Sequence, residues 1–357
     1  MKRFVTVLIL AALALALLTA GAAAASPGRA CAPTPGTVAT FSPGLYGSFA
    51  ESMAADGHGN LYVSLTTWGY YDPDDETTAE SNIGEVWKVA PGHEPVRLAQ
   101  ADLSPYGMLL GVATDRCGRV YVAAYDVASG LTPNGVYRLE GDGSLTQVVA
   151  LREGAWPNGM AFHGNRLYIT DTALGAVWRV RLGCGVASPT EPWLQDDSLA
   201  PGNPAQDETA SGMGANGLAF RGDDLFVGVY DSGSIVRVHV RDDGSHGRPA
   251  VVCERPELKT ADGMAFDLAG GLWITTNMGT TGASPSGALY RLAPSGKLLT
   301  VADDPGWLNY PTMPVFGTTP RTAFTLYVEN GALFGSDDGS SPDIRALRVG
   351  IPGLPLW

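Results

Sequence analysis

Basic residues are scarce in this sequence, which has 23 Lys and Arg against 36 Asp and Glu and a formal net charge of −13. A protein that binds nucleic acid needs clustered Lys and Arg to neutralise phosphates. The charge therefore argues against nucleic acid as a partner. The familiar hydrolase and nucleotide motifs are also missing, since the chain has no GxSxG, no HExxH and no P-loop.

Cysteine is equally rare, with four residues spread far apart and never in a CxxC spacing. That spacing argues against a structural zinc site. In an exported protein an even number predicts up to two disulfides, and three pairings remain open. The four cysteines are Cys31, Cys117, Cys184 and Cys253.

Long apolar runs are limited to one, at residues 4–18, which follows Lys2 and Arg3. Three small residues, Ala23 to Ala25, then precede Ser26 and Pro27, as a signal peptidase requires. The alternative, a membrane anchor, is less favoured because spanning a bilayer takes about 20 residues. We therefore predict a signal peptide at 1–25 and a secreted or extracytoplasmic, monomeric protein with one domain at 26–357.

A repeat dominates the remaining chain, and its 46 Gly and 25 Pro suit a fold with many tight turns. Each unit has a polar or small residue, a short apolar strand, a turn and a second strand. Units begin 59, 48, 58, 46 and 50 residues apart, a period typical of propeller blades. The six units start at Glu51, Leu110, Asn158, Asn216, Asp262 and, in degenerate form, Thr312.

Further strands follow each pair, beginning with Gly and alternating apolar with polar residues, as in 84–90 and 175–182. The last unit lacks an obvious fourth strand, and residues 37–41 can supply it. We therefore predict an all-β fold, a six-bladed propeller of four-stranded antiparallel blades closed by an N-terminal strand. A pair of β-sandwiches or a β-solenoid is the alternative.

The first residue of each unit should face the central channel, where four of the six carry a side-chain oxygen. The four are Glu51, Asn158, Asn216 and Asp262. Two carboxylates and two amides form a hard, all-oxygen ligand set that suits Ca²⁺, with Mg²⁺, Mn²⁺ or Zn²⁺ as alternatives. Asn-Gly and Asp-Gly are also common turn dipeptides, so turn chemistry is the competing interpretation.

Several segments, among them 51–64, 156–172 and 261–277, resemble the regucalcin/gluconolactonase family of six-bladed, calcium-dependent lactonase-like propellers. The resemblance covers about residues 45–335. It implies that Glu51, Asn158, Asn216 and Asp262 bind one divalent metal. It further implies hydrolysis of a lactone or related ester, with Asp262 as the general base.

Two departures from the family bear on the substrate. Glu51 is followed by Ser52 and Met53 instead of the usual Gly-Pro, and Leu110 replaces a polar residue in the second unit. Aromatic and apolar residues are expected at the channel mouth instead, and these are our candidates for substrate binding: Trp68, Tyr106, Trp156 and Met213. The alternative function is a non-catalytic ligand- or protein-binding propeller whose metal is structural.

Overall fold

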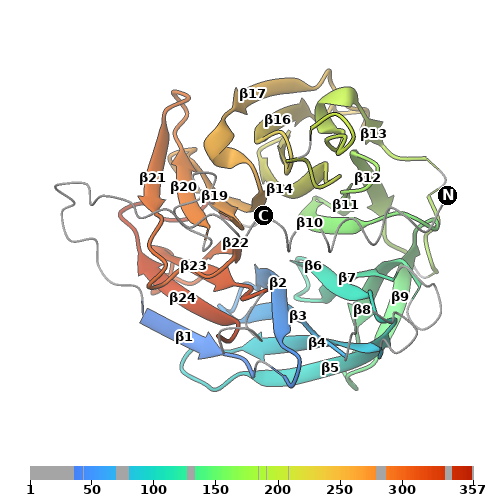
Figure 1. Ribbon diagram of the computed structural model, residues 1–357, viewed down its shortest axis with the longest axis vertical. Coiled ribbons are helices and arrows are strands. Elements are labelled where there is room, and N and C mark those ends of the chain that lie inside the picture. The colour runs from blue at the N-terminus through green and yellow to red at the C-terminus, as the bar shows by residue number, and fades with distance from the viewer. Residues whose placement is uncertain are drawn as a thin grey trace.

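The computed structural model describes residues 36–42, 44–69, 80–126, 133–183, 185–189, 191–207, 209–278, 287–333 and 340–355. Within these ranges six antiparallel sheets of four strands surround a central axis as propeller blades (Figure 1). Helical structure there is limited to two 3-10 helices, η2 (Asp197–Leu199) and η3 (Pro256–Leu258). The predicted all-β six-bladed propeller is confirmed.

The first three blades follow the chain, each running from its innermost to its outermost strand. Blade 1 comprises β2 (Ser48–Ala55), β3 (Leu61–Thr67), β4 (Asn82–Val89) and β5 (Val96–Leu103). Blade 2 comprises β6 (Met108–Thr114), β7 (Val120–Tyr125), β8 (Gly135–Leu139) and β9 (Leu145–Ala150). Blade 3 comprises β10 (Pro157–His163), β11 (Arg166–Asp171), β12 (Ala176–Arg181) and β13 (Leu194–Gln195).

The last three blades keep this order, except that blade 6 takes its outer strand from the other end of the chain. Blade 4 comprises β14 (Ala215–Arg221), β15 (Asp224–Val229), β16 (Ser234–His239) and β17 (Ala250–Glu254). Blade 5 comprises β18 (Ala261–Phe266), β19 (Leu272–Thr276), β20 (Ala288–Leu292) and β21 (Leu298–Ala302). Blade 6 comprises β22 (Pro311–Phe316), β23 (Thr325–Asn330), β24 (Asp343–Arg348) and β1 (Gly36–Thr40).

The ring is closed by β1, which pairs antiparallel with β24 between Gly36 and Ala346 and between Thr40 and Asp343. The predicted N-terminal closing strand is therefore confirmed. Main-chain hydrogen bonds between β1 and β24 therefore join the two ends of the chain within one sheet, which closes the ring.

The core lies between the blades. The buried apolar residues of the described chain form six clusters, and each cluster draws on two consecutive blades. Strands near the axis are consequently buried on both faces, as in β3 and β19. This is why they read as continuous apolar runs, whereas strands further out alternate with polar residues.

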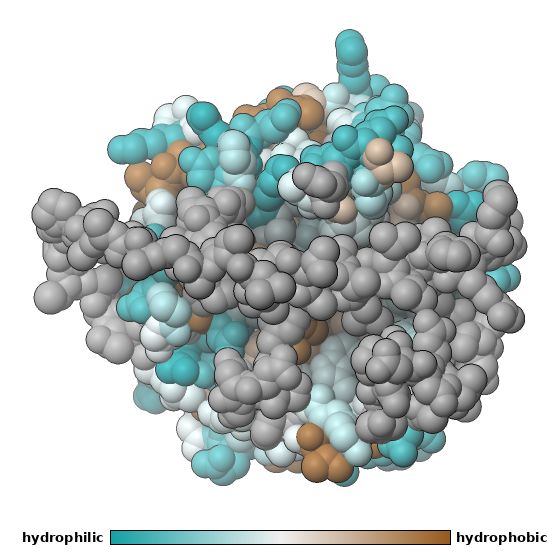
Figure 2. Space-filling view, viewed as in Figure 1, coloured by the Kyte–Doolittle hydropathy of each residue, from teal (hydrophilic) through white to brown (hydrophobic). Residues whose placement is uncertain are grey.

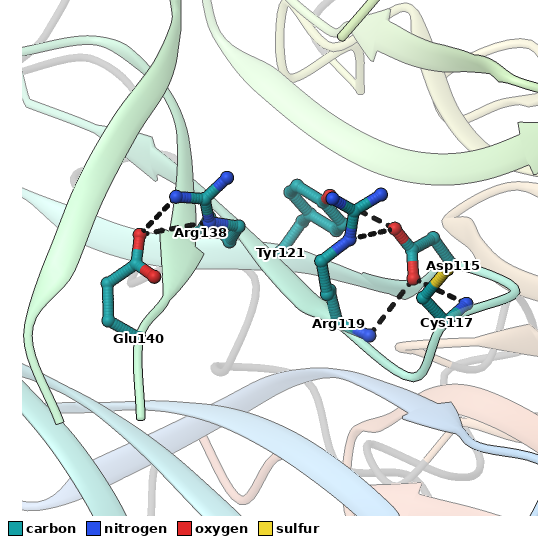
Figure 3. A network of polar contacts seen from close by, with 6 residues as sticks. All are labelled: Asp115, Cys117, Arg119, Tyr121, Arg138 and Glu140. Atoms are coloured by element: carbon teal, nitrogen blue, oxygen red, sulfur yellow. Dashed lines mark hydrogen bonds and ion pairs between the residues drawn. The ribbon is translucent and has the colours of Figure 1, made fainter. Parts of the chain in front are cut away.

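An aspartate at the first hairpin turn recurs in blades 1, 2 and 5. In blade 2, Asp115 Oδ1 accepts hydrogen bonds from the Cys117 and Arg119 amides, at 2.9 and 3.0 Å (Figure 3). Its Oδ2 accepts from Arg119 Nε at 2.6 Å and from the Tyr121 hydroxyl at 3.1 Å. Asp56 and Asp267 serve the same purpose in their blades, so the carboxylate anchors the turn to the next strand.

The predicted disulfides do not form between the cysteines in the described part of the chain. Cys117 and Cys253 are free thiols, the first exposed and the second half-buried. Cys31, Cys184 and the predicted signal peptide at 1–25 lie outside the described residues. No helix among the described residues is long and apolar enough to cross a membrane. Hydrophilic residues cover most of the coloured surface in Figure 2.

Candidate metal centre

Every innermost strand carries a bulge at the equivalent point, where its pairing with the second strand shifts register. The shifts fall at 50/52, 109/112, 157/160, 215/218, 261/264 and 311/314. The first residue of each predicted unit occupies its bulge. These residues are Glu51, Leu110, Asn158, Asn216, Asp262 and Thr312. Because a bulge redirects a side chain, the six equivalent bulges place six side chains at one height around the axis.

Glycine follows four of these residues, and its role is close packing rather than turn formation. A Cβ on Gly217 would lie 1.8 Å from the Asp262 carbonyl oxygen, and one on Gly111 would lie 1.9 Å from that of Asn158. Neither Gly159 nor Gly217 has a positive φ, and both lie within strands. The turn interpretation is therefore wrong, because these glycines let the bulge of one blade approach the next.

The four predicted ligands are buried and lie on the innermost strands of their blades. Glu51, Asn158, Asn216 and Asp262 are each at most 7% exposed. Their strands belong to the ring of innermost strands, several of which are labelled around the centre of Figure 1. The Glu51 carboxylate accepts a hydrogen bond from the Asn158 side chain and interacts electrostatically with Asp262.

The two carboxylates repel each other in a buried setting. Burial raises the pKa of Glu51 well above its usual value, and the charges of Asp262 and Glu329 raise it further. Burial also raises the pKa of Asp262 to about 7, although a hydrogen bond from Asn277 partly opposes the shift. None of the ion pairs in the described chain involves either carboxylate. A bound cation would supply the missing positive charge.

The donor atoms fit a hard divalent cation. Asn216 Oδ1 is buried and has no hydrogen-bond partner, an arrangement that proteins usually avoid unless a ligand, ion or water completes it. The described residues contain no cluster of three or more His, Cys, Asp or Glu that could hold a metal. A cation here would therefore need amide oxygens beside the carboxylates, and oxygen-only sets of this kind suit Ca²⁺.

Sequence reasoning missed four polar residues near this ring. Asn277 Nδ2 donates to Asp262 Oδ2 at 2.8 Å. Tyr230 and Tyr310 are buried, and the pKa of each hydroxyl is raised by burial and by the charges of Asp262 and Glu51. The Tyr230 hydroxyl interacts with the Tyr310 hydroxyl and has no other hydrogen-bond partner among the described residues. Glu329 is fully buried across from Thr312 in blade 6.

One of these residues had a signal in the sequence. Aligning the second strands places Glu329 of LYVE beside Ser64 of LYVS, Thr170 of LYIT and Thr275 of LWIT. The tyrosines had none, because they lie in the connections at the ends of strands, where the repeat breaks down.

Backbone strain gathers at the same end of the propeller. Three residues other than glycine in the described chain have a positive φ, namely Thr260 (63°), Tyr310 (54°) and Ala332 (50°). Thr260 and Tyr310 each lie two residues before a bulge residue, Asp262 and Thr312. Such conformations cost roughly 1–3 kcal/mol each and concentrate at functional sites.

The predicted substrate-binding residues also lie in segments at this end. Trp68 follows β3 and stacks on Phe49, with ring centroids 6.4 Å apart. Trp156 stacks on Tyr125 at 4.7 Å, and its indole nitrogen is buried without a partner. Tyr106 lies half-buried between β5 and β6. Met213 precedes β14, where its backbone amide donates to Asp231. Their contact with a substrate stays a prediction.

Residues 199–329 match the family model described as the SMP-30/gluconolactonase/LRE-like region. The resemblance to the regucalcin/gluconolactonase family is confirmed over this part of the chain. The match includes Asn216 and Asp262, whereas Glu51 and Asn158 lie before its first residue. No curated protein sequence matches the chain significantly.

Solved structures share the architecture. Regucalcin, a calcium-binding protein from Agrobacterium tumefaciens, is 16% identical with a TM-score of 0.56, covering 88% of this chain and 93% of its own. An auxiliary nutrient binding protein from Bacteroides ovatus is 14% identical with a TM-score of 0.50, covering 89% and 76%. A gluconolactonase from Xanthomonas campestris is 16% identical with a TM-score of 0.48, covering 88% and 89%. At such identities the similarity to regucalcin and to the nutrient binding protein shows the fold alone.

Proposed function

We propose that this protein is a secreted, metal-dependent hydrolase of a lactone or related ester. One divalent cation, Ca²⁺, would be held by Glu51, Asn158, Asn216 and Asp262. The observation that carries the proposal is the pairing of two buried, uncompensated carboxylates with an unpartnered amide oxygen on Asn216. The matching family model and the calcium-binding function named for the Agrobacterium protein support it.

When bound, the cation would polarise the ester carbonyl as a Lewis acid. Asp262 suits the role of general base because Asn277 engages its Oδ2, which leaves Oδ1 to accept a proton. The proton would come from the water that attacks the carbonyl carbon. As the bond between that carbon and the ring oxygen breaks, Asp262 would return the proton to the leaving oxygen, and the product is a hydroxy acid.

The Tyr230 hydroxyl suits a role in orienting the substrate. It is a buried donor whose partner among the described residues is the Tyr310 hydroxyl, and it lies close enough to Glu51 and Asp262 for their charges to raise its pKa. A donor aimed at the ester carbonyl would stabilise the oxyanion that develops there. Trp68 and Trp156, which are expected at the channel mouth, each stack on another aromatic ring. A channel mouth lined by such rings suits a substrate with an apolar body.

The test combines metal analysis with a substrate panel. The metal content of the purified protein would be measured, followed by hydrolysis of lactones and aryl esters with and without chelator. One equivalent of Ca²⁺ and chelator-sensitive turnover would support the proposal. Bound metal without turnover on any substrate would favour the alternative, a ligand- or protein-binding propeller with a structural cation. Absence of binding, even after Ca²⁺ addition, would contradict the metal centre itself.

Two aspartates of blade 5 provide a matched comparison. Asp262→Asn should abolish turnover, because an amide cannot accept the proton. Asp267→Asn is the control, since that carboxylate is equally buried but bonds Gly271, Trp273 and Arg291 at the hairpin. It should lower thermal stability and leave turnover of the folded protein unchanged.

A further inference from the structure

In each blade, the residue of the second strand that lies opposite the bulge of the first strand is close to the neighbouring blade. Five blades carry a small residue there: Ser64, Ala123, Thr170, Gly228 and Thr275. In blades 1, 3 and 5 the hydroxyl donates to the carbonyl oxygen of the next blade's bulge residue, at 2.5–2.6 Å. Blade 6 breaks this pattern, because the position holds Glu329.

The Glu329 carboxyl group is incompletely satisfied. It is fully buried, and its Oε1 has no hydrogen-bond partner. The Thr312 hydroxyl lies 3.1 Å from its Oε2 and 3.2 Å from the Ala50 carbonyl oxygen, so one proton serves two acceptors. No ion pair in the described chain includes Glu329. A buried carboxyl group left in this state is costly unless an ion or ligand completes it.

The surroundings of Glu329 point to the cation. Its charge interacts unfavourably with Asp262 and with Glu51, the two carboxylates of the predicted ligand set. Thr312, its hydrogen-bond partner, occupies the bulge of the blade between those of Asp262 and Glu51. The three carboxylates do not form a cluster close enough to coordinate one metal together. Glu329 would therefore influence the cation indirectly and would not coordinate it.

We propose that Glu329 is a third carboxylate of the cation site, acting on the bound ion through water or the Thr312 hydroxyl rather than as a direct ligand. The inference rests on the proposed function and extends it to the substrate. With a divalent cation bound and all three carboxylates ionised, the site would carry one excess negative charge. In a buried site this excess disfavours anionic ligands. The substrate is accordingly an uncharged lactone or ester rather than a carboxylate or phosphate.

The test measures Ca²⁺ binding by calorimetry, without reference to turnover. The wild-type isotherm tests the proposed function, and the ratio of variant to wild-type affinity tests this inference. Glu329→Gln keeps the shape and removes the charge, so Ca²⁺ affinity should fall about tenfold or more. Glu329→Thr, which restores the residue of blades 3 and 5, should lose as much. Glu329→Asp keeps the charge and should retain most of the affinity.

Asp171→Asn is the control, because Asp171 is also fully buried but bonds Trp178 and the backbone of blade 3. Its Ca²⁺ affinity should stay within twofold of wild type. Inorganic phosphate added to the Ca²⁺-loaded protein should bind Glu329→Gln more tightly than wild type. The inference is overturned if wild type binds Ca²⁺ and Glu329→Gln binds it within twofold as well. Equal losses in the Gln and Asp variants would also overturn it, since they would show a packing role.

Discussion

Asn277 and Asp262 face each other across the first two strands of blade 5, and the Asn277 amide donates a 2.8 Å hydrogen bond to Asp262 Oδ2. The same amide group donates to the Pro311 carbonyl oxygen of blade 6 at 3.2 Å. Asn277 thus positions a predicted ligand and general base while it joins two blades. It is a positioning residue in our account, because nothing requires it to touch the substrate.

Asn277→Ala should therefore weaken Ca²⁺ binding about tenfold, because it releases Asp262 from its orientation. The variant also loses two buried hydrogen bonds, which should lower the free energy of unfolding by about 1–3 kcal/mol. Asn82→Ala is the control, since Asn82 is buried in blade 1 and donates to Pro105 and Gly107. Calorimetry and chemical denaturation should show a similar stability loss in both variants, with weakened Ca²⁺ binding only in the first. Equal Ca²⁺ affinities would refute the positioning role.

Gly217→Ala should damage the metal centre through the backbone. The added Cβ would overlap the Asp262 carbonyl oxygen, which lies 1.8 Å from its ideal place, so the blades must separate at the bulge. We expect a loss of several kcal/mol in stability and no measurable Ca²⁺ binding. Gly141→Ala is the matched control, because its Cβ would meet no atom within 4 Å. A Gly217→Ala protein with wild-type melting temperature and Ca²⁺ affinity would disprove the close approach.

The metal-free protein should become less stable as the pH rises from 5 to 8. Burial raises the pKa of Asp262 to about 7 and raises that of Glu51 as well, so the folded state binds more protons than the unfolded state. Their contribution to stability is present below the unfolded pKa of about 4 and is lost as the pH passes the folded values.

Thermal melting in chelator should accordingly show a falling melting temperature across this range, and saturating Ca²⁺ should remove the fall. Asp262→Asn should reduce the slope in chelator. A melting temperature that rises with pH in the metal-free protein would contradict the repulsion between the two carboxylates.

Tyr230→Phe should separate stability from activity. Among the described residues the hydroxyl interacts with Tyr310 alone, so its removal should leave the free energy of unfolding within about 1 kcal/mol of wild type. Turnover of the best lactone or ester should fall about 10- to 100-fold, because an oxyanion donor is lost. Ca²⁺ affinity serves as the internal control and should not change. Unaltered kcat/KM in a folded variant would exclude Tyr230 from substrate binding.

The repeat made the architecture predictable from the sequence. Units such as those beginning at Glu51 and Asn158 are each too small to bury their apolar faces alone, so they must stack, and six of them close a ring. The same alignment put the four oxygen-bearing residues in register, because equivalent positions of stacked repeats meet at the axis. The closing strand was predictable too, since the sixth unit lacked one.

Tertiary structure alone decided the role of glycine and the identity of the remaining polar residues. In the sequence, Gly217 is typical of a turn. In the structure, the Asp262 carbonyl oxygen of the next blade lies where a Cβ on Gly217 would be. The sequence alignment marks Glu329 as unusual, but only the structure shows that this carboxyl group is buried with Oε1 unpartnered and that Tyr230 is buried close to Glu51 and Asp262. The number of cysteines likewise could not tell that Cys117 and Cys253 are free thiols. Sequence periodicity determines which residues share a height on the axis, whereas desolvation and unmet hydrogen bonds depend on atoms contributed by other blades.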